Sequence, residues 1–324
     1  MNTSTSIRRF LPTANCQLLL PLLLLLALGQ GQAQTERGGQ PHEQLDAVLW
    51  VQQSAEYQAA ALQAYNQARA ALDVALADTT WTAALEQTGP FGQLPPAVIL
   101  DVDETALDNS PHQGRLILGD MVFNRASWDR WVKEELAEPV PGALQFCQYA
   151  AHQGVTVFYV TNRRDHLREA TRNNLRKMGF PLADDRETLF TRGDISAKGP
   201  RRAAIAQQFR ILLLLGDNTA DFAPGFRGAG IDERAALAER YADWWGRRWI
   251  MLPNPMYGSW EEALPGFDYS QSRSERVRAK RRALRLTAST NYRWRGWDEL
   301  HRGSHSFIAI INHSGGFGST AGRR

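Results

Sequence analysis

Short apolar runs alternate with helix-like segments through the middle of the chain. Four such runs are residues 97–100, 155–160, 211–215 and 249–252. Each is bounded by polar or turn-forming residues, a pattern typical of short strands buried on both faces. Strands that alternate with helices favour an α/β protein with a mostly parallel sheet flanked by helices.

Apolar residues recur at helical spacing before and between these runs. They predict one long helix over residues 42–77 and a second, short one over 80–87, which Gly89-Pro90 ends. Residues 165–178 and 198–208 are predicted to be helices that connect strands. We therefore expect a sheet whose faces are covered by helices.

One segment interrupts the alternation directly after the first strand. Residues 106–141 carry Phe123, Trp128 and Trp131 among charged side chains. Together with the helices of residues 42–88, this insert is expected to form a small helical cap. The folded domain is expected to span residues 34–270.

The N-terminal 33 residues have the order of a secretory signal. Arg8 and Arg9 precede an apolar run over residues 18–28, and small residues follow at Gly31-Gln32-Ala33. The run is shorter than the roughly 20 apolar residues of a membrane-spanning helix. We expect export and cleavage near Ala33, with an uncleaved N-terminal anchor as the alternative.

The chain has two cysteines, Cys16 and Cys147. Cleavage removes Cys16, and one remaining cysteine cannot form an internal disulfide. Cys147 lies in an apolar-patterned segment, so it is expected to be a small core residue rather than a nucleophile.

The positive charge is concentrated at the C-terminal end. The 324 residues carry a net charge of +3, but residues 271–324 hold 12 Lys/Arg against 3 Asp/Glu, which leaves residues 34–270 acidic. The basic pI therefore does not indicate a specific nucleic-acid binder. Residues 271–324 are expected to be a disordered basic tail; the alternative is contact with an anionic surface of the cell envelope.

Acidic residues follow two of the predicted strands. Asp101 and Asp103 come directly after the first, and side chains two apart on an extended segment point to one side. Two facing carboxylates repel each other unless a cation or a shared proton lies between them, and Mg²⁺ prefers oxygen ligands. The alternative is that Asp103 only caps the next turn.

The third strand is followed by Asp217 and Asp221, whose i, i+4 spacing places both on one side of a helical turn. Alone, this pair fits helix capping. Ligands of parallel α/β sheets bind beyond the carboxyl ends of the strands. Two acidic pairs at such ends therefore indicate one metal or ligand site.

Two further residues lie where they could hold a phosphate. Thr161 ends the second strand, and Lys198 begins the helix that leads into the third. A lysine there could neutralise a transferring phosphoryl group. Arg201 and Arg202 are competitors for that role.

This ordered set resembles the motifs of the haloacid dehalogenase-like (HAD) phosphatase superfamily. The resemblance narrows to the class C acid phosphatases (subfamily IIIB), the family of bacterial outer-membrane lipoprotein 5′-nucleotidases, and covers about residues 42–270. The segments that carry it are residues 101–111, 127–132, 157–163, 196–198 and 251–260.

The resemblance implies a Mg²⁺-dependent phosphomonoester hydrolase on a HAD-like fold. Asp101 would be the nucleophile that forms an aspartyl-phosphate, and Asp103 the general acid and base. Thr161 and Lys198 would bind phosphoryl oxygens.

In the same family, Mg²⁺ is held by the carboxylates that match Asp101 and Asp217 and by the backbone carbonyl that matches Asp103. The residue that matches Asp221 does not bind the ion directly but contacts the groups that do. The ion lets an anionic nucleophile approach an anionic phosphate.

The resemblance also implies the substrate. Trp128 and Tyr257 match rings that stack a nucleobase or another aromatic leaving group, which fits nucleoside 5′-monophosphates; the alternative is that either ring belongs to the core. Asn162 and Arg163 are expected near the rim of the same site as substrate-binding residues.

Two features depart from the family pattern. A lipid-accepting cysteine after the apolar run is absent, which favours a periplasmic or secreted form, and the segment after residue 285 has no recognised counterpart. A homodimer is an expectation from the family. The alternative functions are a phosphotransferase that uses the same intermediate and a non-catalytic exported binding protein.

Overall fold

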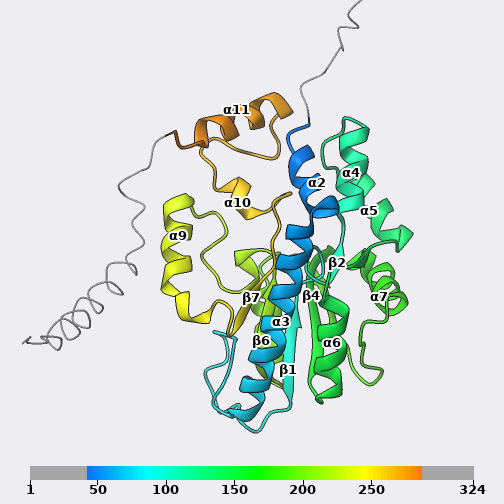
Figure 1. Ribbon diagram of the computed structural model, residues 1–324. Coiled ribbons are helices and arrows are strands. Elements are labelled where there is room, and N and C mark those ends of the chain that lie inside the picture. The colour runs from blue at the N-terminus through cyan, green and yellow to red at the C-terminus, as the bar shows by residue number, and fades with distance from the viewer. Residues whose placement is uncertain (1–41, 287–324) are drawn as a thin grey trace, which may run out of the picture. The chain divides into compact units, whose positions relative to one another are not determined.

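A parallel sheet of five strands forms the centre of the computed structural model, which describes residues 42–286 (Figure 1). The strand order is β5-β4-β1-β6-β7. The bounds are β1 Pro96–Leu100, β4 Thr156–Arg164, β5 Leu189–Arg192, β6 Arg210–Gly216 and β7 Trp249–Met251. All four predicted strands are present, and the α/β architecture is confirmed. The short edge strand β5 was not predicted, because its sequence Leu-Phe-Thr-Arg is not an apolar run.

Alternate residues of the strands pack into two separate cores. Val98 and Leu100 of β1 belong to the core on one face, which also contains apolar residues of helices α3 (Ala55–Ala77), α6 (Ala143–His152) and α7 (Arg168–Lys177). Ala97 and Ile99 belong to the core on the other face, with residues of α8 (Gly199–Ala206). Figure 1 shows α3 and α6 in front of the sheet. Burial on both faces is why the strands read as continuous apolar runs.

The N-terminal segment differs from its prediction in two places. Residues 42–77 form two helices, α2 (Leu45–Gln53) and α3, because the extended residue Ser54 separates them. Its hydroxyl donates to the Trp50 carbonyl at 2.6 Å and accepts from the Tyr57 N–H at 3.0 Å, so it ends one helix and caps the next.

No helix forms over residues 80–87. This segment instead packs against the start of β6, where the Ala83 N–H donates to the Ile211 carbonyl at 2.8 Å and Trp81 is buried. Tertiary contacts therefore override the local helical pattern.

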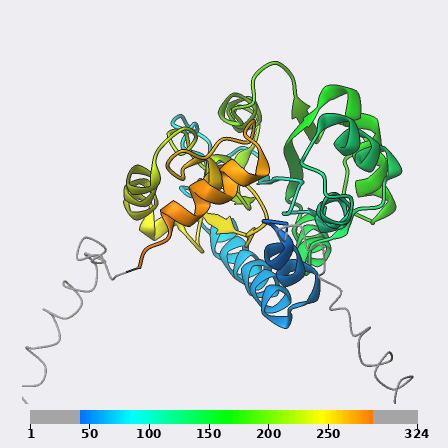
Figure 2. The same ribbon diagram turned by 90° about the horizontal axis from the view of Figure 1, so that it is seen from above.

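The insert after β1 contains two helices and a small antiparallel pair of strands. These are β2 (Leu107–Asp108), α4 (Ser110–Leu118), α5 (Arg125–Glu134) and β3 (Glu138–Pro139). Helix α2 packs against α4, so the N-terminal helix and the insert lie side by side (Figures 1 and 2).

The chain after β6 adds α9 (Ile231–Arg240), α10 (Ser259–Glu262) and α11 (Arg273–Ala283). Helix α11 lies inside the segment that was expected to be disordered. Two ion pairs hold it: Arg276 Nε lies 2.9 Å from Glu43 Oε1, and Lys280 Nζ lies 2.5 Å from Glu261 Oε1. Figure 2 shows α11 (orange) beside the start of α2 (blue). Charge pairing between distant segments therefore orders part of the basic region.

Two sequence predictions fall outside the described residues: the signal segment of residues 1–33 and the basic region from residue 287. Among the helices of residues 42–286, none has the length and apolar character that crossing a membrane requires. Cys147 is completely buried in the core, and burial raises the pKa of its thiol to about 12, which confirms a packing role.

Candidate active site

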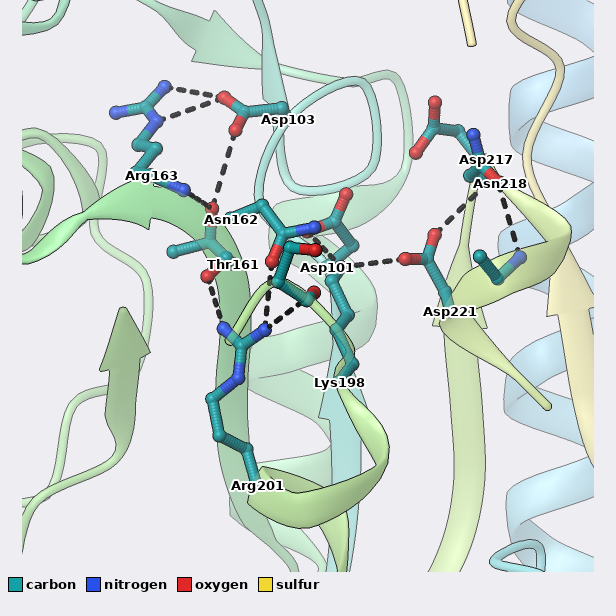
Figure 3. Close-up of polar contacts among 12 residues, drawn as sticks. Asp101, Asp103, Thr161, Asn162, Arg163, Lys198, Arg201, Asp217, Asn218 and Asp221 are labelled. Atoms are coloured by element: carbon teal, nitrogen blue, oxygen red, sulfur yellow. Dashed lines mark hydrogen bonds and ion pairs between the residues drawn. The ribbon is translucent and has the colours of Figure 1, made fainter. Parts of the chain in front are cut away.

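Three carboxylates and one ammonium group meet beyond the ends of β1 and β6 (Figure 3). One oxygen each of Asp101, Asp217 and Asp221 lies within 4.8 Å of the others. The Lys198 Nζ lies 2.5 Å from Asp101 Oδ1 and 2.7 Å from Asp221 Oδ1, and its side chain is only 6% exposed. The structure thus brings together four of the predicted site residues.

The geometry of the turn after β6 depends on a glycine and a capping asparagine. Asn218 caps a 3₁₀ turn, Thr219–Asp221, and its N–H donates to Asp221 Oδ2 at 3.0 Å. A Cβ on Gly216 would lie 2.7 Å from the Asp221 Cβ, closer than carbon atoms pack. Only glycine therefore lets the Asp221 side chain fold back over the strand end.

The electrostatics show an excess of buried negative charge. Burial raises the pKa of Asp101 to about 7, although Lys198 opposes the shift. Burial, followed by repulsion from Asp221 and Asp101, raises the pKa of Asp217 well above its usual range. Burial lowers the pKa of Lys198, but the Asp101 and Asp221 carboxylates outweigh that effect and raise it overall. One lysine does not balance three carboxylates, so the cluster suits a divalent cation.

Asp103 is not one of the three clustered carboxylates, although its charge still acts on Asp101. After Asp101 the chain turns instead of staying extended: Glu104 has a left-handed backbone with φ 55°, and the Leu107 N–H donates to the Val102 carbonyl at 2.8 Å. The Asp103 carboxylate consequently points toward Arg163, which it contacts at 2.9 Å (Figure 3).

Thr161 lies between Asp103 and the lysine-bearing segment. Its hydroxyl donates to Asp103 Oδ2 at 3.3 Å, and its carbonyl accepts from Arg201 Nη1 at 2.5 Å. Arg201 also binds Asn162 Oδ1 at 2.8 Å and the Ser196 carbonyl at 3.2 Å. Arg201 therefore ties the end of β4 to the loop that precedes Lys198.

Lys198, Arg201 and Arg202 were the candidates for neutralising the phosphoryl group. Of these, Lys198 contacts the carboxylates through its side chain. Arg202 is buried and pairs with Glu86 at 2.6 Å. It also donates to the Asp221 carbonyl, so it holds the backbone of Asp221 in place. Arg163 was expected at the rim, but its side chain is 1% exposed and lies behind Asp103.

The aromatic residues fall into two groups. Half-buried Trp128 lies near His112, Phe123 and the Arg163 guanidinium, whose carbon is 5.5 Å from the ring centre. Tyr257 instead packs against the cluster of Val48, Val51, Tyr57 and Met256. No direct ring contact joins Trp128 to Tyr257 within residues 42–286. Trp131 is buried and donates to Asn109 Oδ1 at 2.8 Å, which makes it a core residue.

Two asparagines of the site were not singled out from the sequence. Asn254 Nδ2 donates to Asp217 Oδ2 at 2.8 Å, and Asn109 Nδ2 donates to Asp103 Oδ1 at 3.0 Å. Asn254 follows β7 closely, so the rule that found the aspartates, polar residues after a buried strand, could also have found it. Asn109 carries no such signal, because a turn of the insert returns it to the site.

Comparisons with known proteins agree with this fold and identify the family. The family model described as HAD superfamily, subfamily IIIB (Acid phosphatase) matches residues 35–260. The structure of the class C acid phosphatase from Bacillus anthracis is similar, with 32% identity, a TM-score of 0.67, and coverage of 76% of this chain and 99% of that chain. The structure of that class C acid phosphatase with tungstate bound gives 32% identity, a TM-score of 0.68, and coverage of 77% and 99%.

A plant relative matches over a shorter stretch. Acid phosphatase 1 of Solanum lycopersicum is 30% identical over 167 residues, which are 49% of this chain and 57% of that protein. The match thus spans little more than half of the plant enzyme's length. On the family model and the matching fold, the chain belongs to the acid phosphatases of HAD subfamily IIIB.

Proposed function

We propose that this protein hydrolyses phosphomonoesters outside the cytoplasm, with Mg²⁺ as cofactor and nucleoside 5′-monophosphates as preferred substrates. The observation that carries the proposal is the Lys198 ammonium held between Asp101 and Asp221 in a cluster of three carboxylates. A relative with a tungstate-bound structure adds support, because tungstate is a tetrahedral oxyanion like phosphate. Export rests on the signal-like residues 1–33 alone.

In the first step, an Asp101 carboxylate oxygen attacks phosphorus and the bond to the ester oxygen breaks. The leaving oxygen takes a proton from Asp103, and the phosphoryl group remains on Asp101 as an aspartyl-phosphate. Lys198 and Thr161 bind phosphoryl oxygens, so Lys198 exchanges part of its contact with Asp101 for the substrate.

In the second step, water attacks the phosphorus of the aspartyl-phosphate. Asp103 takes the proton from that water, and the bond between phosphorus and the Asp101 oxygen breaks. The products are the alcohol and inorganic phosphate, and both aspartates return to their starting states.

The residues present fit a divalent cation. Asp101, Asp217 and Asp221 would hold it, Asn254 would orient the Asp217 oxygen, and the backbone carbonyl of Asp103 is the further ligand that the resemblance implies. When bound, Mg²⁺ supplies positive charge that offsets the repulsion between carboxylate and phosphate.

Phosphate release from a panel of monoesters, with Mg²⁺ and then with a chelator, tests the proposal. We expect metal-dependent release that favours nucleoside 5′-monophosphates. Asp101→Asn should lose at least about 100-fold in turnover, because an amide is a poor nucleophile, while its circular dichroism stays native. A fully active Asp101→Asn variant would contradict the mechanism, and release without nucleotide preference would contradict the substrate.

A further inference from the structure

We infer that Arg163 is a positioning residue that holds the Asp103 carboxylate in one orientation, with Oδ1 bound and Oδ2 left for the reacting ester. This inference rests on the proposed phosphatase function. It replaces the expectation that Arg163 binds substrate at the rim, because the arginine lies behind Asp103 (Figure 3).

The two oxygens of the Asp103 carboxylate have different surroundings. Oδ1 accepts hydrogen bonds from Arg163 Nε at 2.9 Å and from Asn109 Nδ2 at 3.0 Å, and Arg163 Nη2 also lies 2.9 Å from it as an ion pair. Within residues 42–286, Oδ2 accepts only from the Thr161 hydroxyl, at 3.3 Å. Arg163 and Asn109 therefore hold Oδ1, and Oδ2 is the oxygen left to contact the substrate.

The arginine that imposes this difference is itself rigidly held. Its side chain is 1% exposed, whereas that of Asp103 is 19% exposed. Nη2 also donates to Asn109 Oδ1 at 3.2 Å, and Nη1 donates to Thr171 Oγ1 at 3.3 Å. A buried guanidinium with fixed partners sets the carboxylate orientation more closely than a solvated lysine could.

The same network reaches both subsites of the proposed reaction. The Arg163 N–H donates to the Thr161 hydroxyl at 3.0 Å, and this hydroxyl in turn faces Asp103 Oδ2. On its other side, the guanidinium lies over the Trp128 ring, which is predicted to stack the leaving group. Arg163 thus contacts both the threonine proposed to bind phosphate and the ring proposed to stack the leaving group.

The proton balance follows from this arrangement. As the ester bond breaks, the proton on Oδ2 moves to the leaving oxygen. In the second step, Oδ2 takes a proton from the attacking water and returns to its starting state. Oδ1 stays bound to Arg163 and Asn109 throughout.

Two esters of similar shape, phenyl phosphate and p-nitrophenyl phosphate, provide the test. Phenolate is a poor leaving group that needs the proton, whereas p-nitrophenolate leaves without it. In Arg163→Met we expect kcat/KM for phenyl phosphate to fall about 100-fold, the lower end of general-acid contributions, and for p-nitrophenyl phosphate only a few-fold. Asp103→Asn should show the same selectivity, and the double variant should add nothing to it.

Arg276→Met is the matched control, because Arg276 is also buried and ion-paired, with Glu43 at 2.9 Å, but lies on α11. It should lower the melting temperature without changing the ratio of the two esters. If Arg163→Met does not fold, Arg163→Lys and Asn109→Ala can replace it, because each removes only some of the donors to Oδ1. Both should shift the ratio of kcat/KM for the two esters in the same direction.

An equal loss with both esters would overturn the inference, because it would mean that Arg163 binds phosphate or only supports the fold. An unchanged ratio with a folded Arg163→Met would overturn it as well. Failure of the proposed function looks different: the wild-type protein would then release phosphate from neither ester.

Discussion

Replacing Lys198 with methionine tests the charge balance of the site directly. Methionine has a similar length and no charge. The change leaves Asp101 and Asp221, whose side chains are 10% and 9% exposed, without the ammonium group that lies 2.5 and 2.7 Å away. These desolvated carboxyl groups then have no cation beside them to offset their negative charge.

The size of the effect follows from the burial of the pair. Removing one partner of a buried ion pair costs about 3–5 kcal/mol, because the remaining charge stays desolvated. For a domain of this size, that corresponds to a fall in melting temperature on the order of 10 °C. A cation has the opposite effect: without a competing ammonium, the carboxylates should bind Mg²⁺ more tightly than they do in the wild type.

The assay is thermal unfolding at pH 7 in chelator and again in millimolar Mg²⁺. We expect Lys198→Met to unfold well below the wild type in chelator and to regain much of the difference with Mg²⁺, since binding to the folded state alone adds stability. Turnover should stay low in both conditions, because Lys198 is predicted to bind the phosphoryl group. Lys280→Met is the control: it breaks the 2.5 Å pair with buried Glu261, and its loss of stability should not respond to Mg²⁺.

The reasoning is refuted if Mg²⁺ stabilises the Lys198 and Lys280 variants equally. It is also refuted if Lys198→Met binds Mg²⁺ more weakly than the wild type. Either result would mean that these carboxylates do not form the cation site. Retained phosphate release would instead exclude Lys198 from phosphate binding.

Two further predictions follow from the same geometry. Gly216→Ala should lower stability by about 1–3 kcal/mol, the usual cost of overpacking, and weaken Mg²⁺ binding measured by calorimetry, because the new Cβ displaces Asp221; unchanged Mg²⁺ affinity would argue against it. The free energy of unfolding should also depend on pH. A carboxyl whose pKa is raised in the folded state costs no stability below its unfolded pKa, where it is protonated in both states. Above its folded pKa it costs the full free energy of ionising in the folded protein. Because the pKa of Asp101 is raised to about 7, protein in chelator should lose stability between about pH 4 and 7, by at most about 4 kcal/mol from this group. Melting curves across that range should show a shallower loss for Asp101→Asn and for the Mg²⁺ form; identical slopes would contradict this account.

Much of the fold could be read from local pattern. The strands β1, β4, β6 and β7 are buried on both faces, so their apolar runs stand out among the polar turns around them. Where burial is partial, the pattern fails: β5 at the sheet edge was missed. Residues 80–87 were misread as a helix because contacts with β6 and α8, remote in sequence, determine their path.

Local sequence features also placed some residues of the site but not others. Asp101, Lys198, Asp217 and Asp221 could be placed from the sequence, because each follows a strand or begins a helix and the carboxyl ends of adjacent parallel strands meet at one edge. The inward turn of Asp221 also has a local cause, Gly216 and the Asn218 cap.

The orientation of Asp103 could not be predicted from the sequence. Its direction is set by the left-handed turn at Glu104 and by donors from Arg163 and Asn109, which lie on β4 and in the insert. Spacing along a chain specifies which side chains can share an edge, but the direction of a polar side chain depends on the donors that distant segments bring to it. The sequence by itself therefore determined four strands of the sheet, the edge where the candidate site lies and the cluster of carboxylates, and hydrogen bonding from distant segments decided which way Asp103 points.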